Sequence, residues 1–333
     1  MINTLRKIFV EKQRWPLEKE FRISRSTRTE TEVLYVTISQ GDHIGRSEVV
    51  PQPRYQETTD SVIAQLNEIT PLIENGLELE KLHLHLSAGA ARNALDCALW
   101  DLKAKLENTS VAKLNSIKEF NGCQTAQTLS IDTVEKMAQS AAELKNYPLI
   151  KVKFDTEQVI EKIQAIFKSA PNSQFIIDAN ESWNIDQLNE FAPIFEKCNV
   201  TLIEQPIAEQ DDMNLKNYIG RVPLCADESL HTSDDLDRIS TLYGCINIKL
   251  DKTGGLTEAL KLLKAARDKD LSVMVGCMVG TSLAMAPASL VASYADFVDL
   301  DGPALLAKDR ENGFSYKDGT MSRLNPKLWG SAI

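Results

Sequence analysis

The 333-residue sequence predicts an α/β fold in which a barrel of parallel strands, the TIM-barrel type, follows a small α+β domain. The first observation is a set of apolar, strand-forming runs that recur every 22 to 27 residues. These runs end near Ser130, Lys153, Asp178, Glu204, Asp227, Lys249, Gly276 and Asp299. The second observation is that acidic and basic residues stand at the ends of at least six of these strands, which a closed ring brings together around one axis.

Residues 1 to about 120 have a different pattern from the rest of the chain. Alternating or β-forming runs predict antiparallel strands over residues Glu20–Arg25, Glu32–Ser39 and Ile44–Val50. Apolar residues three and four apart then predict helices over Ser61–Ile69 and Ala88–Leu106. Three strands and two helices of this length make a small separate domain.

The gaps between the later strands hold helical patterns, as a parallel sheet requires for its crossovers. The predicted helices are Thr156–Ser169, Ile185–Cys198, Ser233–Tyr243 and Thr257–Lys269. An open, doubly wound sheet is the structural alternative. The barrel is favoured because an open sheet would spread the charged strand ends too widely to form one site.

Composition excludes several classes of partner. The chain is 43% hydrophobic and 25% charged, with a net charge of -10, and it has no basic runs, so neither nucleic acid nor an anionic membrane is expected. A small-molecule ligand is the simpler expectation. The N-terminal residues lack the apolar stretch of a signal peptide and no segment is apolar enough to span a bilayer, which predicts a cytoplasmic location. The six cysteines include no Cys-x-x-Cys pair, so neither disulfides nor a zinc knuckle is expected.

Three acids at successive strand ends, Asp178, Glu204 and Asp227, predict a metal site. A single acid there is more often a helix cap or a salt-bridge partner. Three facing carboxylates repel one another, and a divalent cation neutralises them. Oxygen ligands select a hard ion, which makes Mg²⁺ the first choice and Mn²⁺ the second.

Three lysines flank the predicted metal site. Lys151 and Lys153 lie two apart in an otherwise apolar strand, so both side chains point the same way. The alternative is an edge strand with a solvated face. Each ammonium and a nearby cation should lower the pKa of the other lysine and make a base available near pH 7. Lys249 lies on the sixth strand, half a turn of the ring from the second, so a substrate between them would meet a base on each face.

The sequence resembles the enolase superfamily, and within it the muconate lactonizing subgroup, over nearly its whole length. The matching motifs are Lys151-Val-Lys153, Asp178-Ala-Asn-Glu-Ser-Trp183, Glu204-Gln-Pro206, Asp227-Glu-Ser229 and Asn247-Ile-Lys-Leu-Asp-Lys-Thr-Gly-Gly255. The resemblance implies a modified (β/α)7β barrel over residues 121–309. It also implies an α+β capping domain, residues 1–120, completed by residues from about 310 to 333. The chemistry implied is proton transfer through an enediolate stabilised by Mg²⁺, one ion per subunit.

The subgroup is indicated by Asp299-Leu-Asp301 at the end of the eighth strand. A pair of helix-capping acids is the ordinary interpretation. This segment resembles the Asp-x-Asp motif that dipeptide epimerases carry at the same position. In those enzymes its carboxylates bind the free α-ammonium group of the substrate. The resemblance then implies two-base 1,1-proton transfer at the α-carbon of the C-terminal residue of an L-Ala-D/L-Glu type dipeptide. The alternatives are a cycloisomerase, an o-succinylbenzoate synthase or an N-acylamino acid racemase.

Loops of the capping domain should set the side-chain specificity. The segment Phe21 to Glu30 resembles the loop that places an arginine against the side-chain carboxylate of the substrate, and Arg25 is the first choice, with Arg28 as the alternative. Both could equally be solvated turn residues. The segment Pro51–Thr58 resembles a second capping loop. Further expected substrate contacts are Tyr55, Thr128, Cys277 and Met278. Recycling of murein peptides is the implied pathway, and the sequence leaves open whether the chain forms a homo-oligomer.

Overall fold

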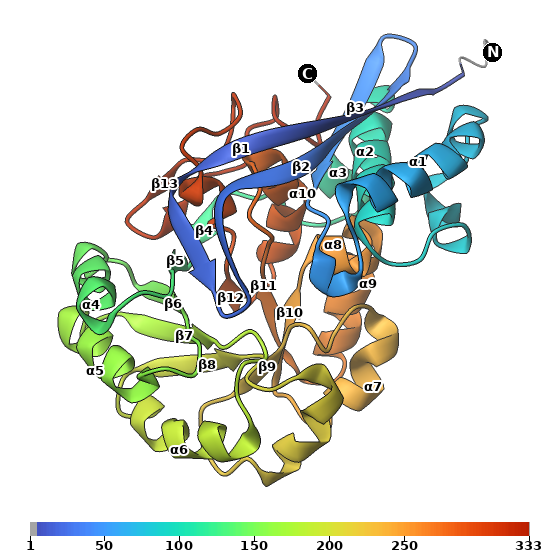
Figure 1. The fold of residues 1–333 in the computed structure, drawn as a ribbon. Coiled ribbons are helices and arrows are strands. Elements are labelled where there is room, and N and C mark those ends of the chain that lie inside the picture. The colour runs from blue at the N-terminus through green and yellow to red at the C-terminus, as the bar shows by residue number, and fades with distance from the viewer. Residues whose placement is uncertain (1–4, 333) are drawn as a thin grey trace.

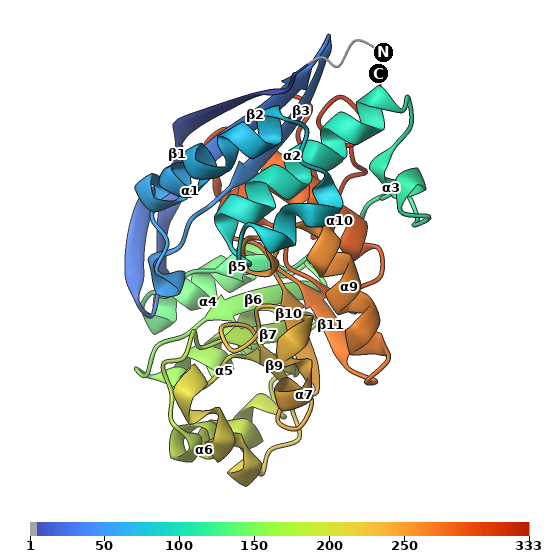
Figure 2. The ribbon, with the colours of Figure 1, turned by 90° about the vertical axis from the view of Figure 1, so that its right-hand side faces the viewer.

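The N-terminal part of the chain forms a three-stranded antiparallel sheet with helices packed beside it. The computed structural model describes residues 5–332. The strands are β1 (Lys7–Ile23), β2 (Ser26–Gln40) and β3 (His43–Val49), in the order β1-β2-β3. The helices are α1 (Thr59–Glu74), α2 (Ala90–Leu106) and the short α3 (Val111–Leu114), and Figure 2 shows α1 and α2 beside the sheet. This is the predicted α+β unit.

The β1–β2 hairpin is much longer than the sequence predicts. Strand β1 begins at Lys7, and its residues alternate between exposed and half-buried, with no fully buried position. Because neither face is strongly apolar, the first half of β1 lacks the hydrophobic alternation by which a strand is recognised. The register shifts between Pro16 and Phe21, where an irregularity bends the hairpin. Its turn reaches the ends of the barrel strands (Figure 1).

The remainder of the chain is built on eight parallel strands that curl into a barrel. The strands are β5 (Gln127–Leu129), β6 (Leu149–Lys153), β7 (Gln174–Asp178), β8 (Val200–Glu204), β9 (Leu224–Ala226), β10 (Cys245–Ile248), β11 (Ser272–Val275) and β12 (Phe297–Val298), in sequence order around the sheet. Each ends within one residue of its predicted end. The first and last strands meet where Ala126 N donates a hydrogen bond to Val298 O at 2.8 Å. The predicted barrel class is therefore confirmed.

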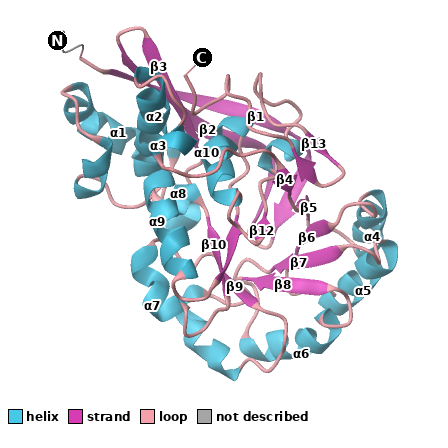
Figure 3. Ribbon diagram, turned by 180° about the vertical axis from the view of Figure 1, so that it is seen from behind, coloured by secondary structure: helices cyan, strands magenta, loops and turns pink. Residues whose placement is uncertain are grey.

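Helices cover the outside of the strands (Figure 3). They are α4 (Val134–Glu143), α5 (Val159–Ser169), α6 (Ile185–Phe195), α7 (Leu236–Ile239), α8 (Leu250–Thr253), α9 (Leu256–Arg267) and α10 (Ser282–Ala292). The predicted helix Ser233–Tyr243 is shorter, since a 3-10 turn at Ser233–Asp235 precedes α7. Another 3-10 segment, Glu209–Asn217, connects β8 to β9. Lys249 caps α8, so Lys252 lies in a helix and not in a loop.

The interior of the barrel is closed by a small apolar cluster below the strand ends. Five inward-facing residues from five adjacent strands form it, namely Ile176, Leu202, Cys225, Cys245 and Met274. Because side chains alternate along a strand, the residue two positions after each one faces the same way. Those positions include Asp178, Glu204 and Asp227. The acids therefore form the layer directly above a sealed core.

The C-terminal residues return to the N-terminal unit. The short strands β13 (Tyr316–Lys317) and β14 (Thr320–Met321) pair with β4 (Cys123–Gln124). Further on, Trp329 Nε1 donates to Cys97 O of α2 at 3.1 Å, and Gly330 N donates to Asp101 Oδ1 at 2.7 Å. These contacts support a capping domain completed by the end of the chain, although the boundaries at residues 120 and 309 stay predictions. Within residues 5–332 no helix has both the length and the apolar character needed to cross a membrane.

Candidate active site

The three predicted metal ligands lie side by side at the carboxyl ends of adjacent strands. Asp178 ends β7, Glu204 ends β8, and the two are direct register partners. Asp227 follows β9. All three are buried, with at most 2% of the residue exposed. The three acids lie at the mouth of the barrel, as the spacing of the strands predicts, and lysine ammonium groups lie between their carboxylates.

Lys151 lies among these carboxylates. Its Nζ is 3.0 Å from Asp178 Oδ2, 2.6 Å from Glu204 Oε2 and 2.7 Å from Asp299 Oδ2. Only 1% of the residue is exposed. The predicted alternative of a solvated edge strand is thus wrong for this side chain, which bridges the third, fourth and eighth strands from its place on β6.

Lys153 and Lys249 approach from opposite sides of the ring. Lys153 Nζ lies 2.5 Å from Asp178 Oδ2, and Lys249 Nζ lies 2.7 Å from Asp227 Oδ2. Lys153 is on the second strand of the barrel, and Lys249 directly follows the sixth. Both line the same pocket. The structure therefore brings the two predicted bases to one cavity from two directions.

The charges of the site differ from the expectation in one respect. Burial opposes the charged form of Lys249, but Asp227 and Glu204 outweigh it and hold its pKa well above the ordinary value. The same balance raises the pKa of Lys151, through Asp178 and Asp299. For Lys151 this is opposite to the predicted lowering, because three carboxylate oxygens lie within 3.0 Å of its ammonium.

The acids respond to the same field in opposite ways. Burial would raise the pKa of Asp178, but Lys151 and Lys153 overcome it and lower this pKa below the ordinary value. Burial and the charge of Asp178 raise the pKa of Glu204 to about 7.

The donor set of the layer fits a hard divalent cation. All three predicted ligands offer carboxylate oxygens, which such ions prefer. In the described part of the chain Glu204 Oε2 accepts no hydrogen bond, and it pairs with the ammonium of Lys151 at 2.6 Å. Within residues 5–332 no three His, Cys, Asp or Glu side chains are gathered as a ready metal cluster. Ammonium groups bridge the acids instead, with Lys151 between Asp178 and Glu204.

The layer opens into a pocket of about 110 Å³ between the barrel and the capping loops. Every residue that the sequence predicts to contact the substrate lines this pocket: Arg25, Tyr55, Thr128, Cys277, Met278, Asp299 and Asp301, together with the alternative Arg28. The pocket thus gathers residues that lie up to 276 positions apart in the chain. Predicted barrel and capping residues therefore meet in this pocket.

Asp299 and Asp301 form an acidic wall of the pocket. Asp301 Oδ2 accepts hydrogen bonds from Thr128 N at 2.6 Å and from Gln127 Nε2 at 3.2 Å. Asp299 Oδ2 contacts Lys151, while its buried Oδ1 has no hydrogen-bond partner among the described residues. Burial and the neighbouring Asp299 raise the pKa of Asp301 to about 7. Lys151 is thus the cation of Asp299, whereas Asp301 makes no ion pair with any described residue.

The two candidate arginines have different surroundings. Arg25 lies at the β1–β2 turn with Nη1 2.7 Å from Glu181 Oε2 and Nη2 2.7 Å from Glu228 Oε1. Arg28 donates a hydrogen bond to Gln52 Oε1 at 3.2 Å and makes no ion pair with any described residue. Burial, and then the charge of Arg25, lower the pKa of Arg28. Arg25 is already neutralised by the protein, and Arg28 is not.

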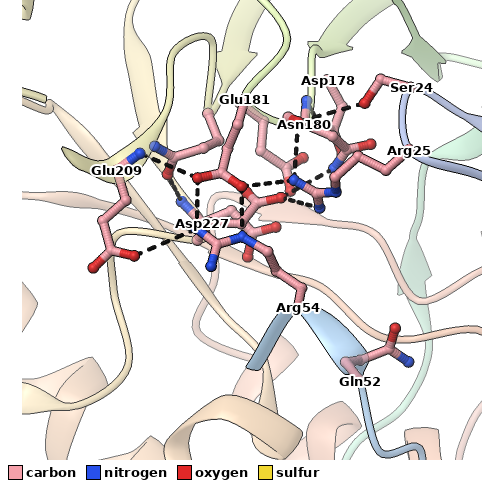
Figure 4. A network of polar contacts seen from close by, with 12 residues as sticks. Ser24, Arg25, Gln52, Arg54, Asp178, Asn180, Glu181, Glu209 and Asp227 are labelled. Carbon is pink, nitrogen blue, oxygen red and sulfur yellow. Dashed lines mark hydrogen bonds and ion pairs between the residues drawn. The ribbon is translucent and has the colours of Figure 1, made fainter. Parts of the chain in front are cut away.

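Four charged residues of the site were missed, although each stands inside a motif used in the sequence analysis. Lys252 Nζ lies 2.6 Å from Asp227 Oδ1. Glu228, adjacent to Asp227, contacts Arg25. Arg54 and Glu181 form a bidentate ion pair, in which Arg54 Nε and Nη2 each donate to one carboxylate oxygen at 2.7 Å (Figure 4). The available signal for these four residues was a charged side chain beside a predicted functional residue. A single sequence does not show which of these neighbouring side chains points into the site.

Comparisons with known proteins agree with this geometry. Two family models match the chain: the mandelate racemase/muconate lactonizing enzyme N-terminal domain over residues 5–115, and the enolase C-terminal domain-like model over residues 133–325. An N-acetyl-D-glutamate racemase of a Pseudoalteromonas species is 46% identical over 302 residues, which cover 90% of this chain and 96% of that protein. The L-Ala-D/L-Glu epimerase of Escherichia coli is 42% identical over 319 residues, covering 95% and 99%.

A solved structure matches nearly the whole model. It is an enolase family member from Agrobacterium tumefaciens, described as homologous to dipeptide epimerases and holding sodium and L-Ala-L-Glu. The TM-score is 0.95 at 41% identity, and the match covers 98% of this chain and 100% of that one. Similarity of this extent includes the strand ends and the capping loops that form the pocket.

Proposed function

Because the chain belongs to the mandelate racemase/muconate lactonizing enzyme family of the enolase superfamily, we propose that it is a dipeptide epimerase. The reaction is inversion of the α-carbon of the C-terminal residue in L-Ala-D/L-Glu type dipeptides. The chain is an isomerase, as its racemase and epimerase relatives are. The observation that carries the proposal is the placement of Lys153 and Lys249 on opposite sides of a pocket with an acidic wall.

Inversion at a carbon centre needs a base on one face and an acid on the other. In our proposal Lys153 and Lys249 exchange these two roles according to which epimer is bound. One lysine removes the α-proton from its face of the carbon, and the other donates a proton to the opposite face. Lys151 contacts Asp178, Glu204 and Asp299 and places a fixed positive charge beside the reacting carboxylate. Its contacts with three carboxylates suit this electrostatic role better than proton transfer.

Enolase superfamily members bind a divalent metal ion, and we infer that here it is Mg²⁺, with Mn²⁺ as the second choice. Asp178, Glu204 and Asp227 would hold it. When bound, such an ion neutralises the acidic layer and stabilises negative charge on the substrate carboxylate. The all-oxygen donor set and the burial of all three carboxylates support this assignment.

The acidic wall selects the other end of the dipeptide. A free α-ammonium group would supply the positive charge missing beside Asp299 Oδ1 and would favour the ionised form of Asp301. The backbone N–H of Thr128 already fixes one oxygen of Asp301, so the carboxylate is oriented before the substrate arrives. A ligand without an ammonium group would leave Asp301 without a cationic partner.

Arg28 is our choice for the side-chain carboxylate of the second residue. It lines the pocket, is half-buried and has no ion-pair partner among residues 5–332. A glutamate carboxylate would compensate the charge of Arg28, because a guanidinium can form two parallel hydrogen bonds to a carboxylate. Arg25, the first choice from sequence, is engaged with Glu181 and Glu228 and has fewer donors to offer.

N-acyl glutamate racemisation is a second candidate function, favoured by the 46% identity to the N-acetyl-D-glutamate racemase. It needs the same two lysines and the same arginine. It does not need the acidic wall, because an acyl group carries no charge. The wall is therefore the feature that divides the two candidates.

Proton exchange in D₂O tests both. Purified protein with Mg²⁺ is incubated separately with L-Ala-L-Glu, L-Ala-D-Glu and N-acetyl-D-glutamate, and deuterium at the glutamate α-carbon is followed by NMR. Deuterium and both epimers should appear with the dipeptides, and the rate with N-acetyl-D-glutamate should be much lower. The reverse order of rates would establish the second candidate. Absence of exchange with all three would favour a cycloisomerase or an o-succinylbenzoate synthase.

A further inference from the structure

One carboxylate on the barrel, that of Glu181, holds two separate capping segments. Its oxygens accept hydrogen bonds from Arg54 Nε and Arg54 Nη2, each at 2.7 Å, and from Arg25 Nη1, also at 2.7 Å. The backbone N–H of Glu209 donates a further bond to it at 3.1 Å. Figure 4 shows both guanidinium groups converging on this carboxylate. Arg25 comes from the β1–β2 turn and Arg54 from the Pro53–Tyr55 turn.

The backbone that carries Glu181 is held in an uncommon conformation. Asn180 and Glu181 both have positive φ, 44° and 67°, which residues with a Cβ adopt rarely. Asn180 N donates to Asp178 Oδ1 at 2.9 Å, and Glu181 N donates to Gln205 O at 2.9 Å. These bonds fix the strained turn directly after a predicted metal ligand. The turn directs the Glu181 side chain away from the barrel and toward the capping loops.

Each arginine is next to a part of the pocket roof. Tyr55, adjacent to Arg54, lines the pocket and packs edge-on against His231 with ring centroids 5.2 Å apart. Ser24 and Arg25 both donate to Asn180 O, at 3.4 and 2.9 Å. The position of both segments over the pocket therefore depends on contacts with the short turn 180–181.

We propose that Glu181 is a positioning residue that fixes both capping segments over the substrate pocket through Arg25 and Arg54. It touches neither the pocket nor the reacting atoms, since it is absent from the pocket lining. Loss of its charge releases the β1–β2 turn and the Pro53–Tyr55 turn together, because Glu181 Oε2 accepts from both Arg25 and Arg54. The consequence for catalysis rests on the proposed function, whereas the consequence for the two segments does not.

Hydrogen exchange measured by mass spectrometry tests the structural part without any substrate. In the variant Glu181→Gln the amides of residues 21–28 and 52–57 should exchange at least about threefold faster, while peptides from the barrel strands keep their rates. Arg267→Gln is the matched control, because Arg267 pairs with Asp296 at 2.6 Å at the opposite end of the barrel. Unchanged exchange in both segments, or faster exchange across the whole chain, would overturn the proposal.

Kinetics test the consequence. With L-Ala-L-Glu, Glu181→Gln should raise KM about tenfold and lower kcat by less than about threefold, since binding and not chemistry is affected. Arg54→Gln should give a smaller effect of the same kind, and the double variant should be no worse than Glu181→Gln alone. Arg267→Gln should match the unmodified protein. A fall in kcat with KM unchanged would refute the positioning role.

The two experiments separate failure of this proposal from failure of the proposed function. If the unmodified protein epimerises no dipeptide, the proposed function fails and the exchange measurement still decides whether Glu181 holds the two segments. If the dipeptide is epimerised and Glu181→Gln behaves as the unmodified protein in both experiments, the positioning role alone is wrong.

Discussion

Lys252 and Lys249 contact different oxygens of the Asp227 carboxylate. Lys252 Nζ lies 2.6 Å from Asp227 Oδ1, while Lys249 Nζ lies 2.7 Å from Asp227 Oδ2. Lys249 lines the pocket and Lys252 does not, and Lys252 also donates to Asn247 O at 3.2 Å. Two lysines three positions apart thus pair with the same carboxylate. Lys249 contacts it from the pocket, and Lys252 contacts it from the interior of the protein.

Replacing Lys252 should destabilise the protein more than replacing an exposed lysine. Lys252→Met leaves Asp227 partly uncompensated in the interior, which costs about 3–5 kcal/mol of unfolding free energy in comparable buried pairs. Urea unfolding measures this loss. The control Lys261→Met breaks an exposed pair with Glu258 at 3.6 Å and should change stability by less than about 0.5 kcal/mol. Equal stability of the two variants would show that Lys252 is not needed to neutralise Asp227.

Removal of either base should separate proton exchange from inversion. Lys153→Ala and Lys249→Ala should each lower epimerisation about 10²- to 10⁴-fold, the usual contribution of a general base. Each variant should still exchange the α-proton of one dipeptide epimer with D₂O, and the two variants should prefer opposite epimers. Chiral chromatography and NMR distinguish inversion from exchange. The same preferred epimer in both variants would contradict bases on opposite faces.

Arg28 should determine the preference for an acidic second residue. Arg28→Gln removes a charged hydrogen bond of roughly 1.5–3 kcal/mol, so kcat/KM for L-Ala-L-Glu should fall roughly 10- to 150-fold. The value for L-Ala-L-Gln should change little. Arg25→Gln is the comparison, because Arg25 contacts Glu181 and Glu228 and its loss should affect both dipeptides alike. An Arg25→Gln variant that loses only the acidic dipeptide would return the role to Arg25.

Patterns of apolar residues predicted the barrel well and the direction of charged side chains poorly. Strand ends at Lys153, Asp178 and Glu204 were predicted to the residue, since buried parallel strands are short, apolar and evenly spaced. The first half of β1 was missed because its residues alternate only between exposed and half-buried. The choice between Arg25 and Arg28 depends on Glu181 and Glu228, which are more than 150 positions away. Such long-range ion pairing has no local signature.

Asp301 should distinguish a dipeptide from an N-acyl amino acid. Asp301→Asn keeps an oxygen that can accept from Thr128 N but removes the charge that would face a substrate ammonium. The value of kcat/KM for L-Ala-L-Glu should fall roughly 10- to 150-fold, as expected for a charged hydrogen bond. Turnover of N-acetyl-D-glutamate, if present, should be unchanged or increased. Equal losses with both substrates would mean that Asp301 acts on pocket structure and not on the ammonium.

Asp251 should make the protein less stable as the pH rises toward neutrality. It lies in α8, where Asn93 Nδ2 and Val50 N donate to its Oδ1 at 3.0 and 3.2 Å, and burial raises its pKa from 3.8 to about 7. Between about pH 4 and pH 7 the folded protein therefore binds a proton that the unfolded chain has released. Since the folded state binds more protons, the free energy of unfolding decreases with pH across this window.

Asp251→Asn removes this dependence and keeps an oxygen for both donors. The variant should equal the unmodified protein near pH 4 and exceed it at pH 8, where each 1 kcal/mol gained raises the Tm by roughly 1–2 °C for a chain of this length. Other buried acids such as Glu204 titrate in the same window, so the difference between the two proteins is the quantity to measure. Thermal unfolding followed by circular dichroism from pH 4 to pH 8 provides it. A difference that stays constant over this range would show that Asp251 has the same pKa in the folded and unfolded states.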